Sequence, residues 1–441
     1  MTSSFPTDQI HWRGVRFQDP AGRVFEFEGE YFRAIYPASV AHIRGLFEKG
    51  IVQPLIERGL LVPTELTPHT LPGFGLLLKH RAAPFALRPH EWARPALRDS
   101  ASAFLDLNLS LLPHGLGTMD AHLANFAQFD ACRPVWLDFG SISPLTKAAT
   151  ALAEYRTALS NPLQLFARAA ALARPVHALL RSGGIDDAEL AALGGTPGPS
   201  LKPTSGIFGR FQKPPTLPGL RERLLRTERE RLPASFPAPQ TAWADYRAED
   251  TLPANYDNLT GRKLAILNVI KRLQPKRVAD LASNSGTFTF LAARHGASVL
   301  ALDFDENALD QLYATARATS IPLNVTCGLS DLTKPREVAA NADLAIALAV
   351  THHLALGQRY PFSYILERLA AFTKDALLVE FMPNGLGGAA GPGPDPLPDW
   401  YSEPQFLAAL RERFNIVEIV DYPRDPAHSP RTLILARGVS T

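Results

Sequence analysis

The residues with the clearest capacity for chemistry lie where predicted strands end, in the second half of the chain. Asp280 closes one predicted strand and runs into the small-residue turn Ala282–Gly286, and Asp303 closes the next strand. In open α/β sheets, ligands bind beyond the carboxyl ends of the strands, where small residues let the main chain approach. A carboxylate on the second strand can accept hydrogen bonds from both ribose hydroxyls, and the helix N-terminus after the turn suits an anionic group.

Three further strand ends carry polar side chains. Ser330 and Asp331 follow the third strand, where a polar group can bind the amino group of an adenine. His352 and His353 follow the fourth strand, and a histidine is the best candidate general base because its pKa lies near neutrality. The alternative is that one histidine packs and the other faces solvent. Glu380, on the fifth strand, either positions a substrate or accepts hydrogen bonds from loop amides.

The elements that must position these residues alternate strictly from Lys263 onward. The predicted strands are Arg277–Leu281, Ser298–Asp303, Pro322–Leu329, Leu344–Val350 and Ala376–Phe381, and the predicted helices include Thr287–His295, Glu306–Thr319 and Pro361–Phe372. Strands that alternate with helices predict an α/β fold, a doubly wound and mostly parallel sheet covered on both faces. The last two strands, Ile416–Asp421 and Arg431–Arg437, lack a helix between them and predict an antiparallel edge.

Four of these strand ends carry a family resemblance. Val278–Gly286 resembles the first motif of class I S-adenosylmethionine-dependent methyltransferases, Val299–Asp305 the second, Ala347–Leu354 the fourth, and Val379–Pro383 the exit of the fifth strand. The resemblance implies a Rossmann-like, seven-stranded domain, S-adenosylmethionine as cofactor and no metal. The cofactor-binding residues that it implies are Asp280, Ala282, Ser283, Asn284, Gly286, Asp303, Phe304, Ser330, Asp331 and Leu348, with His352, His353 and Glu380 as catalytic candidates.

The first motif departs from the family at two positions. Ala282 and Asn284 stand where glycines are usual; alanine is often tolerated, and asparagine adopts positive φ more readily than most residues. A nicotinamide dehydrogenase is a rival interpretation, but its fingerprint needs three glycines and this loop has one. A Rossmann-like domain without any cofactor is a third interpretation, because fold does not imply function.

A second polar cluster lies in the first half of the chain. Asp120, Asn125 and Asp138, which begins an Asp-Phe-Gly sequence, resemble the catalytic loop and metal-binding motif of kinase-like phosphotransferases. In those enzymes the first Asp orients the acceptor hydroxyl, and the Asn and second Asp hold Mg²⁺. No glycine-rich phosphate loop precedes the cluster, and neither Lys49 nor Lys79 stands in the expected strand context. We expect a degenerate kinase-like fold, with an unrelated helical domain as the alternative.

The first half of the chain predicts a mixed domain. Val24–Phe27 and Tyr31–Ile35 predict a hairpin, and Val40–Gly59 has helical spacing that Pro54 is expected to kink or divide. We therefore predict an N-terminal α+β domain over 1–193, a Pro/Gly-rich linker with a charged helix over 194–253, and a methyltransferase domain over 254–441.

The whole chain resembles a bacterial group of two-part methyltransferases that includes host-specific nodulation proteins of rhizobia. The shared pieces are Glu91-Trp92, Arg98–Ala101, Asp120–Asn125, Trp136–Ser141 and Ser429–Leu433. The resemblance implies methyl transfer to a small-molecule acceptor without identifying the acceptor. The alternative is a cofactor-sensing or partner-binding protein with a non-catalytic kinase-like module.

Composition sets wider bounds. The chain has 441 residues, 46% of them hydrophobic, which fits two or three domains with sizeable cores. The net charge is +2 without a basic tail, so no nucleic-acid partner is expected. Cys132 and Cys327 belong to no metal-ligand cluster, which favours a reducing compartment. No secretory signal and no apolar run of membrane-spanning length is found, and a cytoplasmic location is therefore expected. The oligomeric state is left open.

Overall fold

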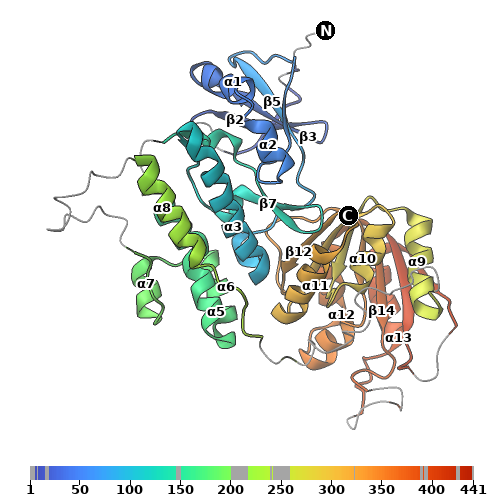
Figure 1. Ribbon diagram of the computed structural model, residues 1–441. Helices are drawn as coiled ribbons and strands as arrows, with labels where there is room; N and C mark the ends of the chain where they lie inside the picture. Colours follow the sequence, from blue (N-terminus) through green and yellow to red (C-terminus); the bar gives the residue numbers. More distant parts are fainter. Residues whose placement is uncertain are drawn as a thin grey trace.

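The structure is a computed structural model in which the chain forms two bodies joined by one continuous apolar core (Figure 1). It describes residues 5–6, 8–14, 19–145, 150–199, 217–238, 241, 259–321, 323–387, 391, 396–423 and 428–439. Most of the predicted linker, 194–253, lies outside the described residues.

The C-terminal body is the predicted seven-stranded sheet, with strand order β12-β11-β10-β13-β14-β16-β15. The strands are β10 (Arg277–Leu281), β11 (Ser298–Asp303), β12 (Val325–Leu329), β13 (Ala342–Ala347), β14 (Thr373–Phe381), β15 (Phe414–Val420) and β16 (Thr432–Val439). The first five are parallel, and β16 lies antiparallel between β14 and β15. The expected mostly parallel sheet with an antiparallel edge is confirmed, and β16 is inserted inside that edge.

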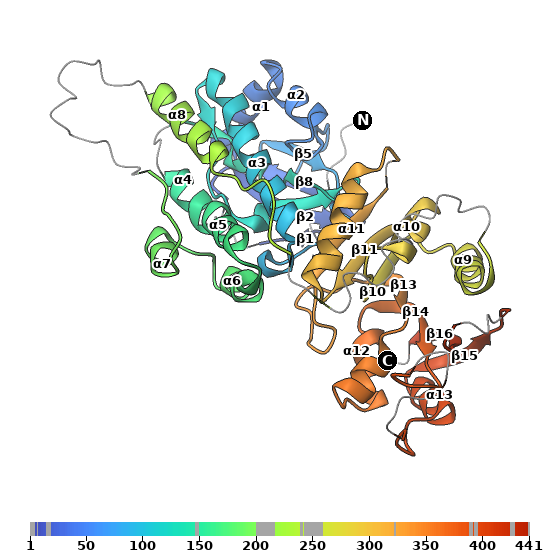
Figure 2. The same ribbon diagram turned by 60° about the horizontal axis from the view of Figure 1, so that its bottom comes forward.

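Helices cover both faces of this sheet (Figure 2). They are α9 (Gly261–Leu273), α10 (Thr287–Arg294), α11 (Glu306–Ala318), α12 (Phe362–Ala370) and α13 (Glu403–Arg411). Figure 2 shows α9, α10 and α11 on one face and α12 and α13 on the other. Because both faces are covered, the central strands are buried along almost their whole length. Within the described residues, no helix combines the length and apolar character needed to span a bilayer.

The strand order brings distant residues to one edge of the sheet. The carboxyl ends of the parallel strands β10, β11, β13 and β14 lie together, as expected for a parallel sheet. β16 runs in the opposite direction, and Thr432 at its start pairs with Phe381 at the end of β14. The residue before β16, Arg431, is therefore placed at the same edge as the ends of the parallel strands.

The N-terminal body begins with a five-stranded antiparallel sheet of order β1-β2-β3-β5-β4. Its elements are β1 (His11–Trp12), β2 (Gly22–Phe27), β3 (Glu30–Ile35), α1 (Val40–Glu48), α2 (Val52–Glu57), β4 (Thr64–Leu66) and β5 (Leu76–His80). The predicted hairpin is confirmed as β2 and β3. The predicted helix is divided at Gly50, which has a φ of 65°, while Pro54 lies in the first turn of α2, where proline is tolerated.

A mainly helical part follows. Its elements are α3 (Arg94–Leu111), β6 (Leu116–Gly117), β7 (Phe126–Phe129), β8 (Arg133–Trp136), β9 (Ser143–Pro144), α4 (Thr150–Tyr155), α5 (Asn161–Arg168), α6 (Ala173–Arg181), α7 (Asp187–Ala192) and α8 (Leu217–Glu230). The predicted charged helix is α8, and it packs against α3. Buried Glu228 of α8 binds buried Arg156 with an N–O distance of 2.7 Å, which fixes α8 to the N-terminal body.

The hairpin β7–β8 lies against the outer edge of β12, so the two bodies are joined by main-chain hydrogen bonds. The amides of Ala131 and Cys132, at the hairpin turn, donate to the carbonyl oxygens of Leu323 and Val325. The Gln128 side chain donates to the carbonyl of Cys327 at 3.1 Å and accepts from its amide at 2.8 Å. These bonds satisfy peptide groups at an edge that would otherwise be open.

Buried ion pairs reinforce this junction. Arg94 at the start of α3 lies 2.7 Å from Asp310 of α11, with 2% of its side chain exposed. Glu91 lies 2.7 Å from Arg336, and both side chains are buried. Removal of one partner from such a pair leaves an uncompensated buried charge, so these contacts hold the two bodies in one relative position.

Candidate functional site

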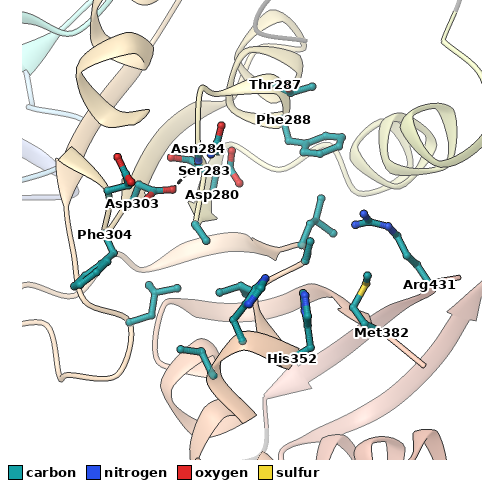
Figure 3. Close-up of a pocket in the computed structure, with 18 of the residues that line it drawn as sticks. Asp280, Ser283, Asn284, Thr287, Phe288, Asp303, Phe304, His352, Met382 and Arg431 are labelled. Atoms are coloured by element: carbon teal, nitrogen blue, oxygen red, sulfur yellow. Dashed lines mark hydrogen bonds between the residues drawn. The ribbon is translucent and has the colours of Figure 1, made fainter. Parts of the chain in front are cut away.

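A cavity of about 570 Å³ opens at the carboxyl edge of the seven-stranded sheet. It is lined by the ends of β10, β11 and β13, by residues after β12 and β14, and by the segment before β16. In Figure 3, Asp303, Asn284 and Phe304 lie on one side of this cavity, and Met382 and Arg431 lie on the other. The cavity therefore spans neighbouring strand tips, as ligand sites of open α/β sheets do.

The loop after β10 adopts the glycine-like conformation that the first motif requires. Ala282, Asn284 and Gly286 all have positive φ, of 58°, 48° and 94°. Gly286 is the N-cap of α10, and its position has no room for a side chain because Phe290 and Leu312 pack against it. Ala282 and Asn284, which stand where the family usually has glycines, therefore keep the shape of the loop. The positive φ of Ala282 strains the backbone, because its Cβ is unfavourable in the left-handed region.

This strain makes a testable prediction. Ala282→Gly should raise the free energy of unfolding by about 1 kcal/mol, because a Cβ in the left-handed region costs roughly that much and glycine has no Cβ. Gly286→Ala is the matched opposite change and should lower the free energy of unfolding. Urea unfolding without added ligand measures both. A destabilised Ala282→Gly variant would contradict this account of the loop.

Asp303 holds the loop while facing the cavity. Its Oδ2 accepts from the amide of Asn284 at 2.7 Å, and its Oδ1 accepts from the amide of Asp305 at 2.8 Å. Each carboxylate oxygen has a further lone pair, so Asp303 can still accept from the two hydroxyls of a ribose. Burial raises the pKa of Asp303 to about 6, against the lowering effect of these amides.

Asp280 lies deeper, at the end of β10. Its Oδ2 accepts a hydrogen bond of 2.6 Å from the hydroxyl of Thr289 on α10. Burial raises the pKa of Asp280 to about 7, with the charge of Asp303 as a smaller cause. Two buried carboxylates in one cavity favour a ligand that brings hydrogen-bond donors or positive charge.

The predicted residues divide into those that line the cavity and those that lie behind its wall. The lining includes Asp280, Ala282, Ser283, Asn284, Asp303, Phe304, Asp331, Leu348, His352 and His353. The cavity lining does not include Gly286, Ser330 or Glu380. Gly286 shapes the loop as the N-cap of α10, and the amide of Ser330 donates to the carbonyl of Asp303.

The two histidines enter the cavity from the segment after β13. His353 begins a π-helical turn, His353–Gly357, a feature often found at functional sites. The rings of His352 and His353 are 3.9 Å apart between centroids. Burial, with smaller effects from His353 and Arg431, lowers the pKa of His352 to about 3, and burial also lowers the pKa of His353. Both imidazoles are therefore neutral at neutral pH, and the lowered pKa makes His352 a weaker base than the ordinary histidine on which the sequence argument relied.

Glu380 has a structural part in the site. It is fully buried and binds two arginines, with 2.9 Å from Arg262 Nη2 to Oε2 and 3.2 Å from Arg431 Nη1 to Oε2. It also accepts a hydrogen bond from the amide of Ala349 at 3.0 Å. Burial alone would raise the pKa of Glu380, but the two guanidinium groups outweigh it and lower the pKa. Glu380 was expected either to position a substrate or to accept hydrogen bonds from loop amides, and its contact with the Ala349 amide favours the second role.

Several lining residues were missed by the strand-end argument. They are Arg262, Ser285, Thr287, Phe288, Asp305, Leu332, Ala349, Val350, Leu354, Gln358, Met382, Leu386, Gly387, Ser429 and Arg431. Arg431 had a partial signal, because it begins the predicted antiparallel edge strand Arg431–Arg437, but its place at the cavity depends on the order of the edge strands. Arg262 comes from the helix before β10 and has no motif around it.

The polar cluster of the N-terminal body is arranged differently. Asn125 donates from its side chain to the carbonyl of Asp120, whose φ is 56°. Arg33 of β3 lies 3.1 Å from Asp138 and also pairs with Asp19. The guanidinium group of Arg33 thus pairs with Oδ1 of the Asp138 carboxylate.

The comparisons with known proteins agree with the two-part resemblance. No protein-family model matches the chain. Nodulation protein NoeA of Rhizobium meliloti (strain 1021) is 24% identical over 450 residues, which cover 91% of this chain and 91% of that protein. The resemblance to the group that includes rhizobial nodulation proteins is therefore confirmed along nearly the whole chain.

Solved structures that resemble the chain cover less of it. Magnesium protoporphyrin IX methyltransferase of Synechocystis PCC 6803, with S-adenosylhomocysteine bound, is 18% identical over 40% of this chain and 84% of its own, with a TM-score of 0.30. The bifunctional kinase-methyltransferase WbdD is 21% identical over 39% of this chain and 37% of its own, with a TM-score of 0.29. At these scores, the fold assignment depends on the strand order of the chain itself.

Proposed function

We propose that this chain is a class I methyltransferase that uses S-adenosylmethionine to methylate a small-molecule acceptor. One observation carries the proposal: a single cavity joins Asp303 and the glycine-like loop at one end to a pair of neutral histidines and a buried cation at the other. The first end suits the adenosine part of the cofactor, and the second leaves room for an acceptor. The full-length similarity to a nodulation protein supports the proposal.

The chain's own residues would mainly orient the reactants. The cofactor supplies an activated methyl group, so alignment of the acceptor with that group can lower the barrier by several kcal/mol. If the acceptor atom is a hydroxyl, its proton needs a base as the bond to carbon forms. His352 is the best placed, because its Nδ1 is buried in the cavity wall without a partner among the described residues.

Calorimetry with S-adenosylmethionine and S-adenosylhomocysteine tests the cofactor site. We expect both to bind in a one-to-one ratio, because the motif residues that the structure describes converge on one cavity. Radiolabelled methyl groups should then pass from the cofactor to the small-molecule fraction of a bacterial extract. Binding without any transfer would favour the alternative of a cofactor sensor, and failure to bind either compound would remove the proposal.

His352→Asn is a specific test of the base. It keeps a polar side chain of lower basicity, so we expect methyl transfer to fall about 100-fold, the usual range for loss of a general base. The dissociation constant of S-adenosylhomocysteine should stay nearly unchanged. His353→Asn is the matched control with the same chemistry at the neighbouring position. Equal losses in the two variants would show that neither histidine alone is the base.

We also propose that the N-terminal body is a degenerate kinase-like domain that does not transfer phosphate. The antiparallel pairs β6–β9 and β7–β8, next to Asp120 and Asp138, support the kinase-like part. The ion pair between Arg33 and Asp138 supports the absence of transfer. Thermal unfolding with and without ATP and Mg²⁺ is the test, and we expect the same melting temperature in both. A clear rise would instead support nucleotide binding.

A further inference from the structure

The end of the cavity away from Asp303 has its own chemistry. Figure 3 shows Arg431, Met382 and His352 grouped on this side, and Ser429 and Leu386 also line the cavity. We propose that the acceptor carries an anionic group, a carboxylate or a phosphate, that binds Arg431, and that its body is apolar. This inference depends on the proposed methyltransferase function and identifies the acceptor class for that same site.

Among the ion pairs of the described residues, the charges beneath the cavity wall include one more cation than anions. Glu380 is shared by Arg262 and Arg431, so one carboxylate faces two guanidinium groups. The side chains of these arginines are only 13% and 8% exposed. A buried cation is stabilised by a matching anion and is costly without one. The acidic residues that line the cavity belong to β10, to the end of β11 and to the segments after β11 and β12, whereas Arg431 precedes β16.

The two arginines differ in what they face. The guanidinium group of Arg262 lies over the ring of Phe288, 5.2 Å from its centroid, and Phe288 is in the first turn of α10. The N-terminus of α10 is the place expected for the carboxylate of the cofactor, so Arg262 lies on the cofactor side. Arg431 directly precedes β16, whose first residue pairs with the last residue of β14, and this is the side left for the acceptor.

Two buried polar atoms at this end have no partner among the described residues. They are Oγ of Ser429 and Nδ1 of His352, and both residues line the cavity. Buried polar atoms are rarely left without hydrogen bonds in native proteins. A bound anion would accept from the Ser429 hydroxyl, and a group near it could donate to His352. Met382, Leu354 and Leu386 also line the cavity, and their apolar side chains suit an aromatic or acyl body.

Small probes test this on the full-length protein saturated with S-adenosylhomocysteine. Benzoate and phenyl phosphate present the two anions on the same apolar ring, and benzamide is the neutral match for benzoate. We expect at least one anion to bind about tenfold or more tightly than benzamide, as charge-assisted bonds to arginine allow. The probe that binds more tightly, benzoate or phenyl phosphate, then shows whether the acceptor carries a carboxylate or a phosphate. Equal affinities for all three probes, or no binding of any, would overturn the proposal.

Two single-residue variants test whether Arg431 and Ser429 cause the preference for anionic probes. Arg431→Gln should abolish the preference for anions and change the affinity for S-adenosylhomocysteine by less than about threefold, because Arg431 is assigned to the acceptor and not to the cofactor. A preference that survives the change would refute the assignment, and so would a large loss of affinity for S-adenosylhomocysteine. Ser429→Ala, outside the ion-pair cluster, should weaken the anion alone and decides the question if Arg431→Gln does not fold. Failure of the wild-type protein to bind S-adenosylhomocysteine would instead count against the proposed function itself.

Discussion

Asp303→Asn should raise the dissociation constant of S-adenosylhomocysteine by about 100-fold or more, because two hydrogen bonds to a charged acceptor contribute about 1.5–3 kcal/mol each. The substitution removes the charge and replaces one acceptor oxygen with a donor. That donor would also face the amide of Asn284 or Asp305, both of which donate to this carboxylate. Calorimetry on the wild type and the variant measures the loss.

The same carboxylate predicts a dependence on pH. Burial raises the pKa of Asp303 to about 6, and the ribose hydroxyls need the ionised form as acceptor. Affinity should therefore be full above pH 6 and fall as the pH drops through this value. Asp303→Asn should lose that part of the pH dependence. Asp375→Asn, at an exposed site near the other end of β14, is the control; a similar loss there would mean that the effect is not specific to the cavity.

Glu380→Gln should lower the free energy of unfolding by about 3–5 kcal/mol, the usual effect of breaking a buried ion pair at one partner. Arg262 and Arg431 would keep their charges in the wall of the cavity with no carboxylate between them. The midpoint of urea unfolding measures this effect. An unchanged midpoint would mean that the two arginines do not depend on Glu380.

The lowered pKa of Glu380 determines how its contribution to the free energy of unfolding changes with pH. A carboxyl group whose pKa is lower in the folded state contributes stability above its unfolded pKa, and this contribution is lost as the pH falls. The deficit of Glu380→Gln should therefore be large at neutral pH and shrink in acid. Glu418→Gln is the matched control, because Glu418 pairs with Arg272 at a half-exposed site, where such pairs contribute at most about 1 kcal/mol.

The half of the cavity that we propose for the cofactor could be predicted from sequence because its residues follow from strand polarity. Asp280 and Asp303 end consecutive parallel strands, and the ends of such strands meet at one edge whatever the order of the others. The loop could also be predicted, since Asn284 adopts the positive φ that glycine would. Leu348 and Asp331 follow from the same rule.

The half of the cavity that we propose for the acceptor could not be predicted in the same way. Arg431 reaches the cavity only because β16 lies between β14 and β15, and a predicted antiparallel edge does not reveal this order. Glu380 was predicted on the correct strand, but its inward direction depends on two arginines that are 118 and 51 positions away. The ion pair between Arg33 and Asp138 is equally remote in sequence.

The hairpin laid along β12 limits how the molecule can be divided. A fragment that began near residue 259 would contain every motif proposed to bind the cofactor. Without the hairpin, however, the peptide groups between Leu323 and Cys327 at the edge of β12 would lose their hydrogen-bond partners. Buried apolar side chains of α11 would also become exposed to water. Exposed strand edges recruit other chains, so such a fragment should self-associate. We therefore regard the two bodies as one unit, in which the N-terminal body covers the edge strand of the sheet that carries the candidate site.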